Sequence, residues 1–337
     1  SQCCTKSEVS DLSDIAISQF RSLWFEKSNN RNVLNCSIEQ LLSDAELFVE
    51  GKLNYAALIL LGTKDALSRY LPNAEIIFEY RSSDNEIRNQ ARENYKVGFF
   101  TILDKLWNLI DARNGMDHLQ EKFVIKDIPY FDKEVIREAI LNAVCHRDYQ
   151  SSSSVFIRQF PKSIIIENPG GFPNGVTPDN ILYRTNPRNR RIAEVFEKCG
   201  LVERSGQGAD KMFRKLIEES KPLPDYSRSD FFNVHLKISA EIQDKTFIQF
   251  ISRIYKEKNI DLSIDELLLL DNIRQGISFH KVMDSQKSEY QNYLHKLLDE
   301  KIIEQISKGK TKKYVLSKEL YPVIPTSKIR IRKDALV

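Results

Sequence analysis

The feature that most constrains this chain is the stretch from 132 to 208, where three polar motifs follow one another at the ends of predicted elements. They are E-A-I-L-N-A-V-C-H-R-D-Y at 138–149, E-N-P-G-G at 167–171 and S-G-Q-G at 205–208. The first lies in a predicted helix, the second leaves a predicted strand, and the third opens another predicted helix. Polar groups and glycines at such positions are typical of a ligand site.

The segment 132–146 has the pattern of an amphipathic helix, with Asp132 at the N-cap and a buried apolar stripe. Glu138, Asn142 and His146 follow at spacings of four and therefore line one side. A carboxamide beside a buried stripe needs a partner, because leaving it unsatisfied costs about 1–3 kcal/mol. A magnesium ion would be such a partner for Asn142, with Glu138 as a general base. The alternative is a helix with an ordinary polar edge.

The second motif follows a buried strand at 164–166, and Asn168 leaves the end of that strand. An Asn side chain can pair with an adenine edge through its carbonyl and its amide. Gly170 and Gly171 would then let the backbone approach a ligand closely. A plain Pro-Gly turn after a strand is the alternative.

The third motif places Gly206 and Gly208 at the start of a helix predicted for 209–217. Free amides at a helix start attract phosphate, and glycines leave space for it. A single G-x-G is weak evidence. The three motifs in this order favour a site for a magnesium-bound nucleotide.

Together the motifs resemble the GHKL-type ATP-binding fold, which gyrase, heat-shock chaperones and histidine kinases share. More narrowly, the chain is similar to bacterial transcriptional regulators with a RecG-like C-terminal domain. Those proteins usually carry an N-terminal AlbA/Schlafen-type domain, which is expected to be absent here, and a winged helix. The resemblance covers about 40–240 and also includes G-K-L-N-Y-A-A-L-I-L-L-G (51–62), Y-L-P-N-A-E-I (70–76), N-P-R-N-R-R-I-A (186–193) and G-L-V-E-R-S-G-Q-G (200–208).

The resemblance implies a role for each matching position. Glu138 would be the catalytic base, Asn142 the magnesium ligand and Asn168 the adenine reader, although the wider superfamily has Asp where this chain has Asn168. His146 would touch phosphate or hold the helix end. The remaining nucleotide-binding positions are Arg147 at the phosphates, Gly170 and Gly171 in the turn, Arg188 and Asn189 in a lid, and Gly206 and Gly208 at the phosphates.

The C-terminal part has the outline of a winged helix-turn-helix, with helices predicted at 263–273, 277–283 and 286–298 before a hairpin. Lysines gather at the tip of this hairpin and can neutralise DNA phosphates. Polar side chains early on the third helix can reach base edges. A solvated hairpin or a protein-binding module is the alternative. The DNA-binding positions are Lys287, Tyr290, Gln291, Asn292, Lys308, Lys310, Lys312 and Lys313.

Four further elements are predicted outside the motifs. They are a helix at 11–25, strands at 55–61 and 75–80, and a long helix at 85–113. The hairpin that precedes the second motif is predicted at 153–160 and 163–167.

The composition limits the class of protein. The 337 residues carry a net charge of +3, too small to identify a nucleic-acid partner, and no run of eighteen apolar residues predicts a membrane span. The five cysteines form no C-x-x-C pair, which favours reduced thiols and a cytoplasmic location. No P-loop precedes Lys310, so a P-loop helicase motor is excluded. The first residue is not Met, which favours a truncated chain.

The sequence therefore predicts an α/β (α+β) fold: a GHKL-like ATPase sandwich with helices on one face of a mixed sheet. The leading hypothesis is an ATP- and magnesium-binding transcriptional regulator that binds DNA and forms a homodimer, with no membrane partner. A GHKL-type ATPase in phage defence or DNA processing, and a degenerate site serving as a scaffold, remain alternatives. The expected domains are 1–120 (helical and mixed), 121–240 (ATP-binding), 241–320 (winged helix) and 321–337 (basic tail).

Overall fold

A computed structural model describes residues 2–83, 90–121, 124–202, 207–277, 287–308 and 311–321. The chain divides into two compact units. Unit 1 is Ser1–Leu216 with Lys221–Glu241, and unit 2 is Ile217–Ser220 with Ile242–Val337. Each unit is described separately below.

Unit 1 is built on a mixed sheet of five strands in the order β4-β3-β7-β8-β9. β3 and β7 are parallel, and the other neighbours are antiparallel. The register aligns Phe78 with Ile157, Ile157 with Ile166, and Ile166 with Leu236, so one face carries a continuous apolar row. The strands are β3 (Ile76–Tyr80), β4 (Ala91–Tyr95), β7 (Val155–Gln159), β8 (Ser163–Pro169) and β9 (Asn233–Ser239).

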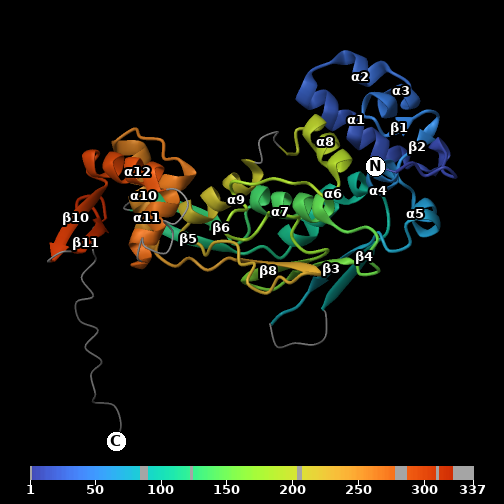
Figure 1. The fold of residues 1–337 in the computed structure, drawn as a ribbon. Coiled ribbons are helices and arrows are strands. Elements are labelled where there is room, and N and C mark those ends of the chain that lie inside the picture. The colour runs from blue at the N-terminus through green and yellow to red at the C-terminus, as the bar shows by residue number, and fades with distance from the viewer. Residues whose placement is uncertain are drawn as a thin grey trace, which may run out of the picture. The chain divides into compact units, whose positions relative to one another are not determined.

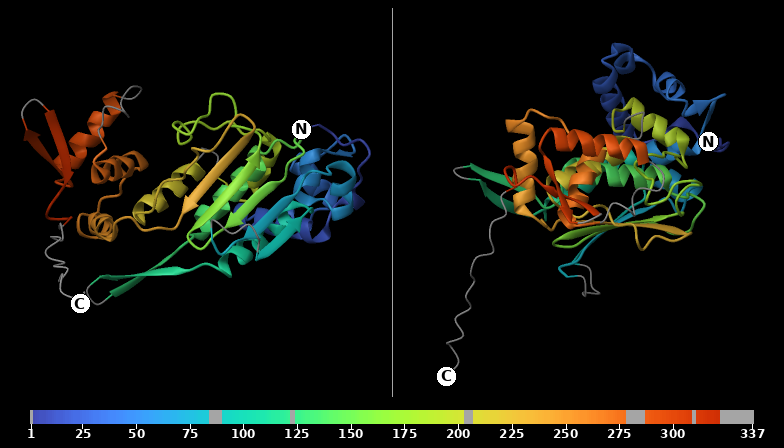
Figure 2. Two further views of the ribbon diagram at one scale, coloured as in Figure 1. Left: turned by 90° about the horizontal axis from the view of Figure 1, so that it is seen from below. Right: turned by 60° about the vertical axis from the view of Figure 1, so that its left-hand side comes forward.

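Helices α6 (Phe99–Asp111), α7 (Lys133–His146) and α9 (Gln207–Glu218) lie on one face of this sheet (Figure 1). Seen from below, the strands lie in front of these helices, and a separate ribbon of β5 and β6 extends away from the sheet (Figure 2). β5 spans Met116–Glu121 and β6 spans Val124–Pro129. The mixed sheet with helices on one face confirms the predicted α/β fold class.

The N-terminal elements join the sheet region through an aromatic cluster. Phe20 and Phe100 have ring centroids 5.5 Å apart, and Phe196 of α8 (Arg190–Lys198) lies 5.5 Å from Phe99. All four rings are buried, so α1, α6 and α8 share one core. The N-terminal elements are a 3-10 helix (Val9–Asp11), α1 (Asp14–Ser28), α2 (Arg31–Asn35), α3 (Ile38–Asp44), β1 (Phe48–Val49), β2 (Lys52–Leu53), α4 (Tyr55–Leu61) and α5 (Lys64–Tyr70).

The strand predicted at 55–61 is wrong, because this segment is helix α4. Asn54 caps the helix by accepting a hydrogen bond from the Ala57 amide at 3.0 Å. Every residue from Ala56 to Leu61 is buried. A short helix that is buried on all sides shows no helical period, so its sequence looks like that of a buried strand.

The helix predicted at 85–113 is also wrong over part of its length, because β4 occupies Ala91–Tyr95 and helix α6 begins at Phe99. Gly98 separates the two elements. A Cβ at Gly98 would lie 2.6 Å from the Leu61 carbonyl carbon, so its backbone crosses the end of α4 at contact distance. This crossing fixes the break between strand and helix.

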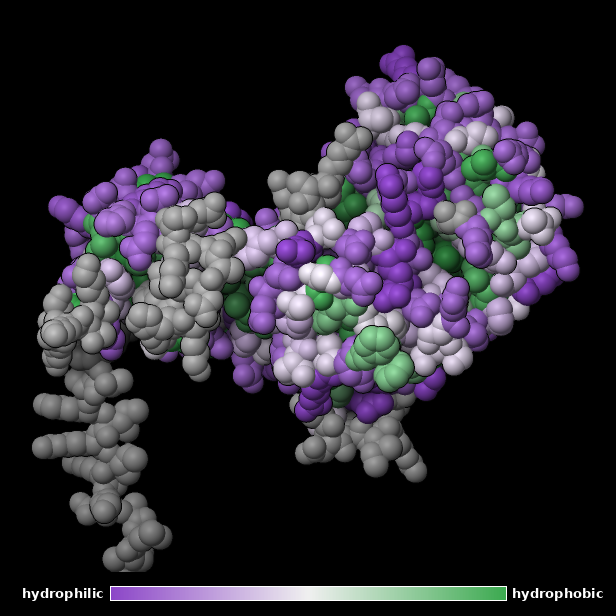
Figure 3. All heavy atoms as spheres, viewed as in Figure 1, coloured by the Kyte–Doolittle hydropathy of each residue, from purple (hydrophilic) through white to green (hydrophobic). Residues whose placement is uncertain are grey.

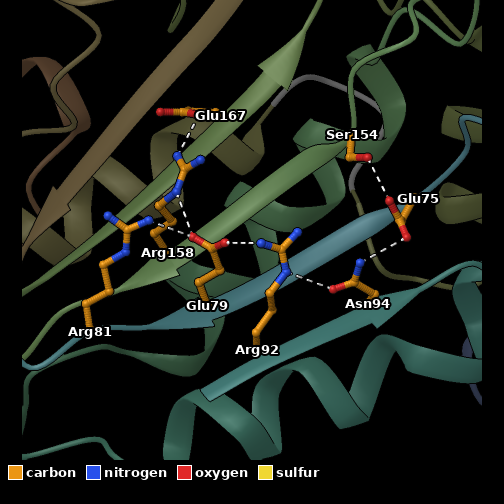
Figure 4. Close-up of polar contacts among 8 residues, drawn as sticks. All are labelled: Glu75, Glu79, Arg81, Arg92, Asn94, Ser154, Arg158 and Glu167. Atoms are coloured by element: carbon orange, nitrogen blue, oxygen red, sulfur yellow. Dashed lines mark hydrogen bonds and ion pairs between the residues drawn. The ribbon is translucent and has the colours of Figure 1, made fainter. Parts of the chain in front are cut away.

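The face of the sheet opposite the helices carries an ion-pair network around Glu79, which is 2% exposed (Figure 4). Arg81 and Arg92 each lie 3.1 Å from its carboxylate, and Arg158 lies 3.0 Å from it. Arg158 also pairs with Glu167 at 2.6 Å. These cross-strand pairs link β4, β3, β7 and β8 on the open face.

Unit 2 contains α10 (Lys245–Glu257), α11 (Ile264–Gln275) and α12 (Lys287–Asp299), followed by a hairpin of β10 (Ile303–Lys308) and β11 (Thr311–Leu316). The predictions at 263–273 and 286–298 are confirmed, whereas the helix predicted at 277–283 lies almost entirely outside the described residues. The sequence did not predict α10. A capping box between Ser263 and Glu266 starts α11.

On the face shown in Figure 3, the coloured residues are mainly hydrophilic, with small hydrophobic patches between them. Within the part of the chain that the structure describes, no helix combines the length and the apolar character needed to cross a bilayer.

Candidate functional site

A cavity of about 340 Å³ lies among α7, α8, α9, the loop 171–187 and the ends of β8 and β9. The site residues predicted from sequence that line it are Glu138, Asn142, His146, Asn168, Gly171 and Gly208. The structure therefore brings together one member or more of each of the three motifs. Gly206 lies outside the described residues.

Glu138 and Asn142 form a pair one helical turn apart on α7. The Asn142 amide donates to Glu138 Oε1 at 2.8 Å, and both side chains line the cavity. Because the nitrogen is engaged in this way, the amide oxygen is the group available to a cation. The described residues include no cluster of three or more His, Cys, Asp or Glu side chains suited to a metal. A magnesium ion here would take one protein oxygen and complete its shell with phosphate and water, which suits this ion.

Asn168 stands at the end of β8 and is 4% exposed. Its Oδ1 is buried without a hydrogen-bond partner and belongs to the cavity lining. An unsatisfied buried acceptor costs about 1–3 kcal/mol, so a donor from a ligand would be stabilising. Beside it, the rings of Phe172 and Tyr226 meet edge to face at 5.6 Å and also line the cavity. An amide next to aromatic walls suits a planar heterocyclic base.

His146 ends α7, and its Nδ1 is buried without a partner. Burial, and secondarily the charge of Arg188, lower the pKa of this imidazole to about 4. The ring is therefore neutral near neutral pH. It can offer a hydrogen bond to a ligand, but it brings no positive charge to a phosphate.

The glycines of the second motif are explained by contacts with protein. Gly170 has φ +94°, and a Cβ there would lie 2.9 Å from the Asp148 side chain. A Cβ at Gly171 would lie 2.4 Å from the Phe231 carbonyl oxygen. The turn is thus packed between two other chain segments, a close approach that only glycine allows. Gly171 also lines the cavity, whereas Gly170 is not among its lining residues.

Three predicted nucleotide-binding residues hold backbone carbonyls instead of facing the cavity. Arg147 is 1% exposed and donates to the carbonyls of Glu75, Asn73 and Ser153. Arg188 donates to the carbonyls of His146 and Gly171, at 3.1 and 2.9 Å. The Asn189 side chain donates to the carbonyls of Cys145 and Arg147, at 2.9 and 2.7 Å. They fix the end of α7 and the base of the loop 171–187.

The sequence motifs did not point to several lining residues. They come from the loop 171–187, from α8 and α9, and from the segment before β9. A hydrophobic residue in an irregular segment, such as Phe172, carried a weak signal. The pattern of α8 was a usable signal, because the helix is amphipathic and carries polar side chains on the face opposite its buried residues. The missed residues include Phe172, Arg184, Asn186, Arg190, Glu194, Glu197, Met212 and Tyr226.

The predicted DNA-binding residues lie in unit 2. Gln291 and Asn292 are exposed on α12, but Tyr290 on the same helix is more enclosed, and its pKa is raised chiefly by burial. Lys312 and Lys313 stand on β11, opposite Ser307 and Ile306. Lys313 is exposed. Lys308 ends β10, Lys287 begins α12, and Lys310 lies outside the described residues.

Comparisons with known proteins agree with this architecture. A family model described as "Putative ATP-dependent DNA helicase recG C-terminal" matches residues 152–236, and a domain of unknown function (DUF8451) matches residues 1–77. No curated protein matches the chain.

A crystal structure of the DIP2311 protein from Corynebacterium diphtheriae is similar, with a TM-score of 0.74 and 20% sequence identity. The match covers 94% of this chain and 64% of that one, and at this identity it shows the fold alone. The chain thus spans less than two thirds of the solved protein. The matched segment 152–236 contains β7, β8, the first residues of β9 and much of the cavity lining, and it is similar to a RecG-like domain of the ATPase type.

Proposed function

We propose that the cavity in unit 1 binds a nucleotide with magnesium, ATP in the first instance. The observation that carries this proposal is Asn168, a buried amide whose unpaired oxygen lines the same cavity as the Glu138–Asn142 pair. Asn168 would recognise the base between Phe172 and Tyr226. The match of 152–236 to an ATPase-type family supports the same reading.

In this arrangement the oxygen of Asn142 would hold the magnesium ion. The ion would neutralise phosphate charge when bound. Glu138 would orient a water through its carboxylate, which Asn142 holds at 2.8 Å. His146 would donate or accept one neutral hydrogen bond at the same end of α7.

Calorimetric titration of magnesium-ATP tests this proposal. Asn142→Ala and Asn168→Ala are each expected to weaken binding by about tenfold, the effect of one lost hydrogen bond or ion contact in an enclosed site. Asn35→Ala is a matched control, because Asn35 is exposed at the end of α2 and away from the cavity lining. Equal affinity of the wild type and both cavity variants would contradict the site, and so would a wild type with no affinity.

A second candidate function is ATP hydrolysis, which is favoured by a carboxylate that faces the cavity. Phosphate release by the wild type that Glu138→Ala abolishes would support an ATPase. Binding without release would support a sensor instead. Glu134→Ala is the control, since Glu134 lies one turn earlier on α7 and is exposed.

We propose in addition that unit 2 is a winged helix-turn-helix that binds DNA, as a transcriptional regulator would, within a homodimer. Three helices followed by a hairpin with Lys312 and Lys313 support this arrangement. Replacing both lysines by Ala should lower affinity for duplex DNA and reduce the salt slope by about 0.9 per lysine. Replacing exposed Lys245 and Lys256 of α10 is the control. Fluorescence anisotropy measures the affinity, and an unchanged salt slope would exclude the hairpin as the DNA-binding surface. Light scattering tests the homodimer separately, and a monomeric mass would contradict it.

A further inference from the structure

Three arginines at the start of α8 differ in what they contact. Arg188 is bound to two backbone carbonyls, as described above. Arg191 pairs with Glu194 at 2.6 Å and also with Glu46, and it does not line the cavity. Arg190 does line the cavity, and its side chain is 85% exposed. Among these three, Arg190 is the cation that can reach a ligand without breaking a buried contact.

Arg190 has one partner among the described residues, Glu194, whose Oε1 lies 2.8 Å from its Nε. This pair spans one turn of α8 and is largely exposed on the arginine side. Such pairs contribute about 0.3–0.5 kcal/mol. If Arg190 leaves Glu194 to bind a phosphate group, the loss of this ion pair therefore costs little.

We propose that Arg190 contacts the phosphates of the bound nucleotide and that Glu194 is the counter-ion which the phosphates displace. This inference rests on the proposed nucleotide function and adds the residue that distinguishes polyphosphates from monophosphates. Arginine binds phosphate through two parallel hydrogen bonds, which an exposed carboxylate pair does not match in strength.

The charge of the cavity supports the need for such a residue. Glu138, Glu194 and Glu197 all line it, so a polyphosphate meets three carboxylates. Arg184 and Arg190 are the arginines that line it within the described part of the chain. Arg190 is the first residue of α8, whereas Arg184 extends from the loop 171–187. Because α8 packs into the core, Arg190 is held in place better than Arg184 for a contact with phosphate.

Glu194 belongs to a second set of ion pairs, which does not include Arg190. Its second oxygen pairs with Arg191, which in turn pairs with Glu46 of the N-terminal elements. When phosphate takes Arg190, Glu194 keeps Arg191 as its remaining partner. The ion pairs that join α8 to Glu46 therefore remain in place when phosphate binds, and Arg191 takes no part in the phosphate contact.

Titrations of magnesium-ATP and of AMP separate a phosphate contact from a structural effect. Arg190→Ala is expected to weaken ATP binding by about tenfold and to leave AMP unchanged, with partial recovery in Arg190→Lys. Glu194→Gln should tighten ATP binding by about threefold, because it removes the competing carboxylate. Arg191→Ala is the matched control on the same helix and is expected to leave the ATP-to-AMP ratio unchanged.

The possible failures can be told apart. If the wild type binds neither ATP nor AMP, the proposed function itself fails and this inference falls with it. If the wild type binds ATP but Arg190→Ala keeps the same ATP-to-AMP ratio, the inference alone is overturned. The inference would also be overturned if Arg184→Ala lost affinity for ATP alone and Arg190→Ala lost none. The phosphate contact would then be assigned to the loop 171–187. Circular dichroism melting checks that each variant is folded.

Discussion

The carboxylate of Glu138 occupies the space in which a side chain at Gly208 would begin. A Cβ at position 208 would overlap both carboxylate oxygens and the carbon between them. Glu138 belongs to α7 and Gly208 is the second residue of α9, so two helices from different motifs meet at one carboxylate. The absence of a side chain at Gly208 thus makes room for the Glu138 carboxylate, and both residues line the cavity.

Gly208→Ala should therefore damage the site without damaging the fold. The new methyl group would push the Glu138 carboxylate away from Asn142, and we expect magnesium-ATP affinity to fall by about tenfold. The same change favours the helix by up to about 1 kcal/mol, so the melting temperature should stay level or rise. Calorimetry and thermal melting measure the two effects. A variant that melts early would show instead that the glycine is needed for packing.

Arg147→Ala should unfold the protein more easily, because three backbone carbonyls would each lose the guanidinium as a donor and a buried side chain would leave a cavity. We expect a loss of about 3 kcal/mol or more in the free energy of unfolding. Arg147→Lys should recover little, since one ammonium cannot reproduce the planar fork. Urea unfolding gives the value. A stable variant with weakened ATP binding would instead support a contact between Arg147 and phosphate.

The five cysteines should divide into two groups by reactivity. Cys4, Cys145 and Cys199 are buried, whereas Cys3 is exposed and Cys36 is half-buried. Burial, with the nearby charge of Glu138, raises the pKa of the Cys145 thiol to about 12. We expect two thiols to react with a disulfide reagent in the native protein and five in denaturant. Three or more fast thiols in the native state would contradict this division.

His146 should make stability depend on pH below neutrality. Its pKa in the folded protein, about 4, lies below the usual 6.5, so the unfolded chain takes up a proton that the folded chain refuses. Stability from this group is complete above pH 6.5 and is lost as the pH falls toward 4. His146→Gln should flatten the fall measured by urea unfolding between pH 6.5 and 5. His295→Gln, which removes a histidine from an exposed position of α12, is the control variant.

Local signals determined much of the secondary structure. The cap at Asp132 and the apolar period after it predicted α7, and the alternating residues on either side of Lys162 predicted the hairpin of β7 and β8. The spacing of four between Glu138 and Asn142 also predicted that they share a face, and the structure joins them by a hydrogen bond. These features depend on residues close together in the chain, so the sequence alone specifies them.

Tertiary structure decided the rest. α4 and α6 were misread because burial on all sides and the crossing at Gly98 involve segments distant in sequence. The same reason explains why Arg147 and Arg188 looked like phosphate ligands, although distant carbonyls hold both. A motif shows which side chains are available, whereas packing determines whether an arginine meets a backbone oxygen or faces the cavity, as Arg190 does.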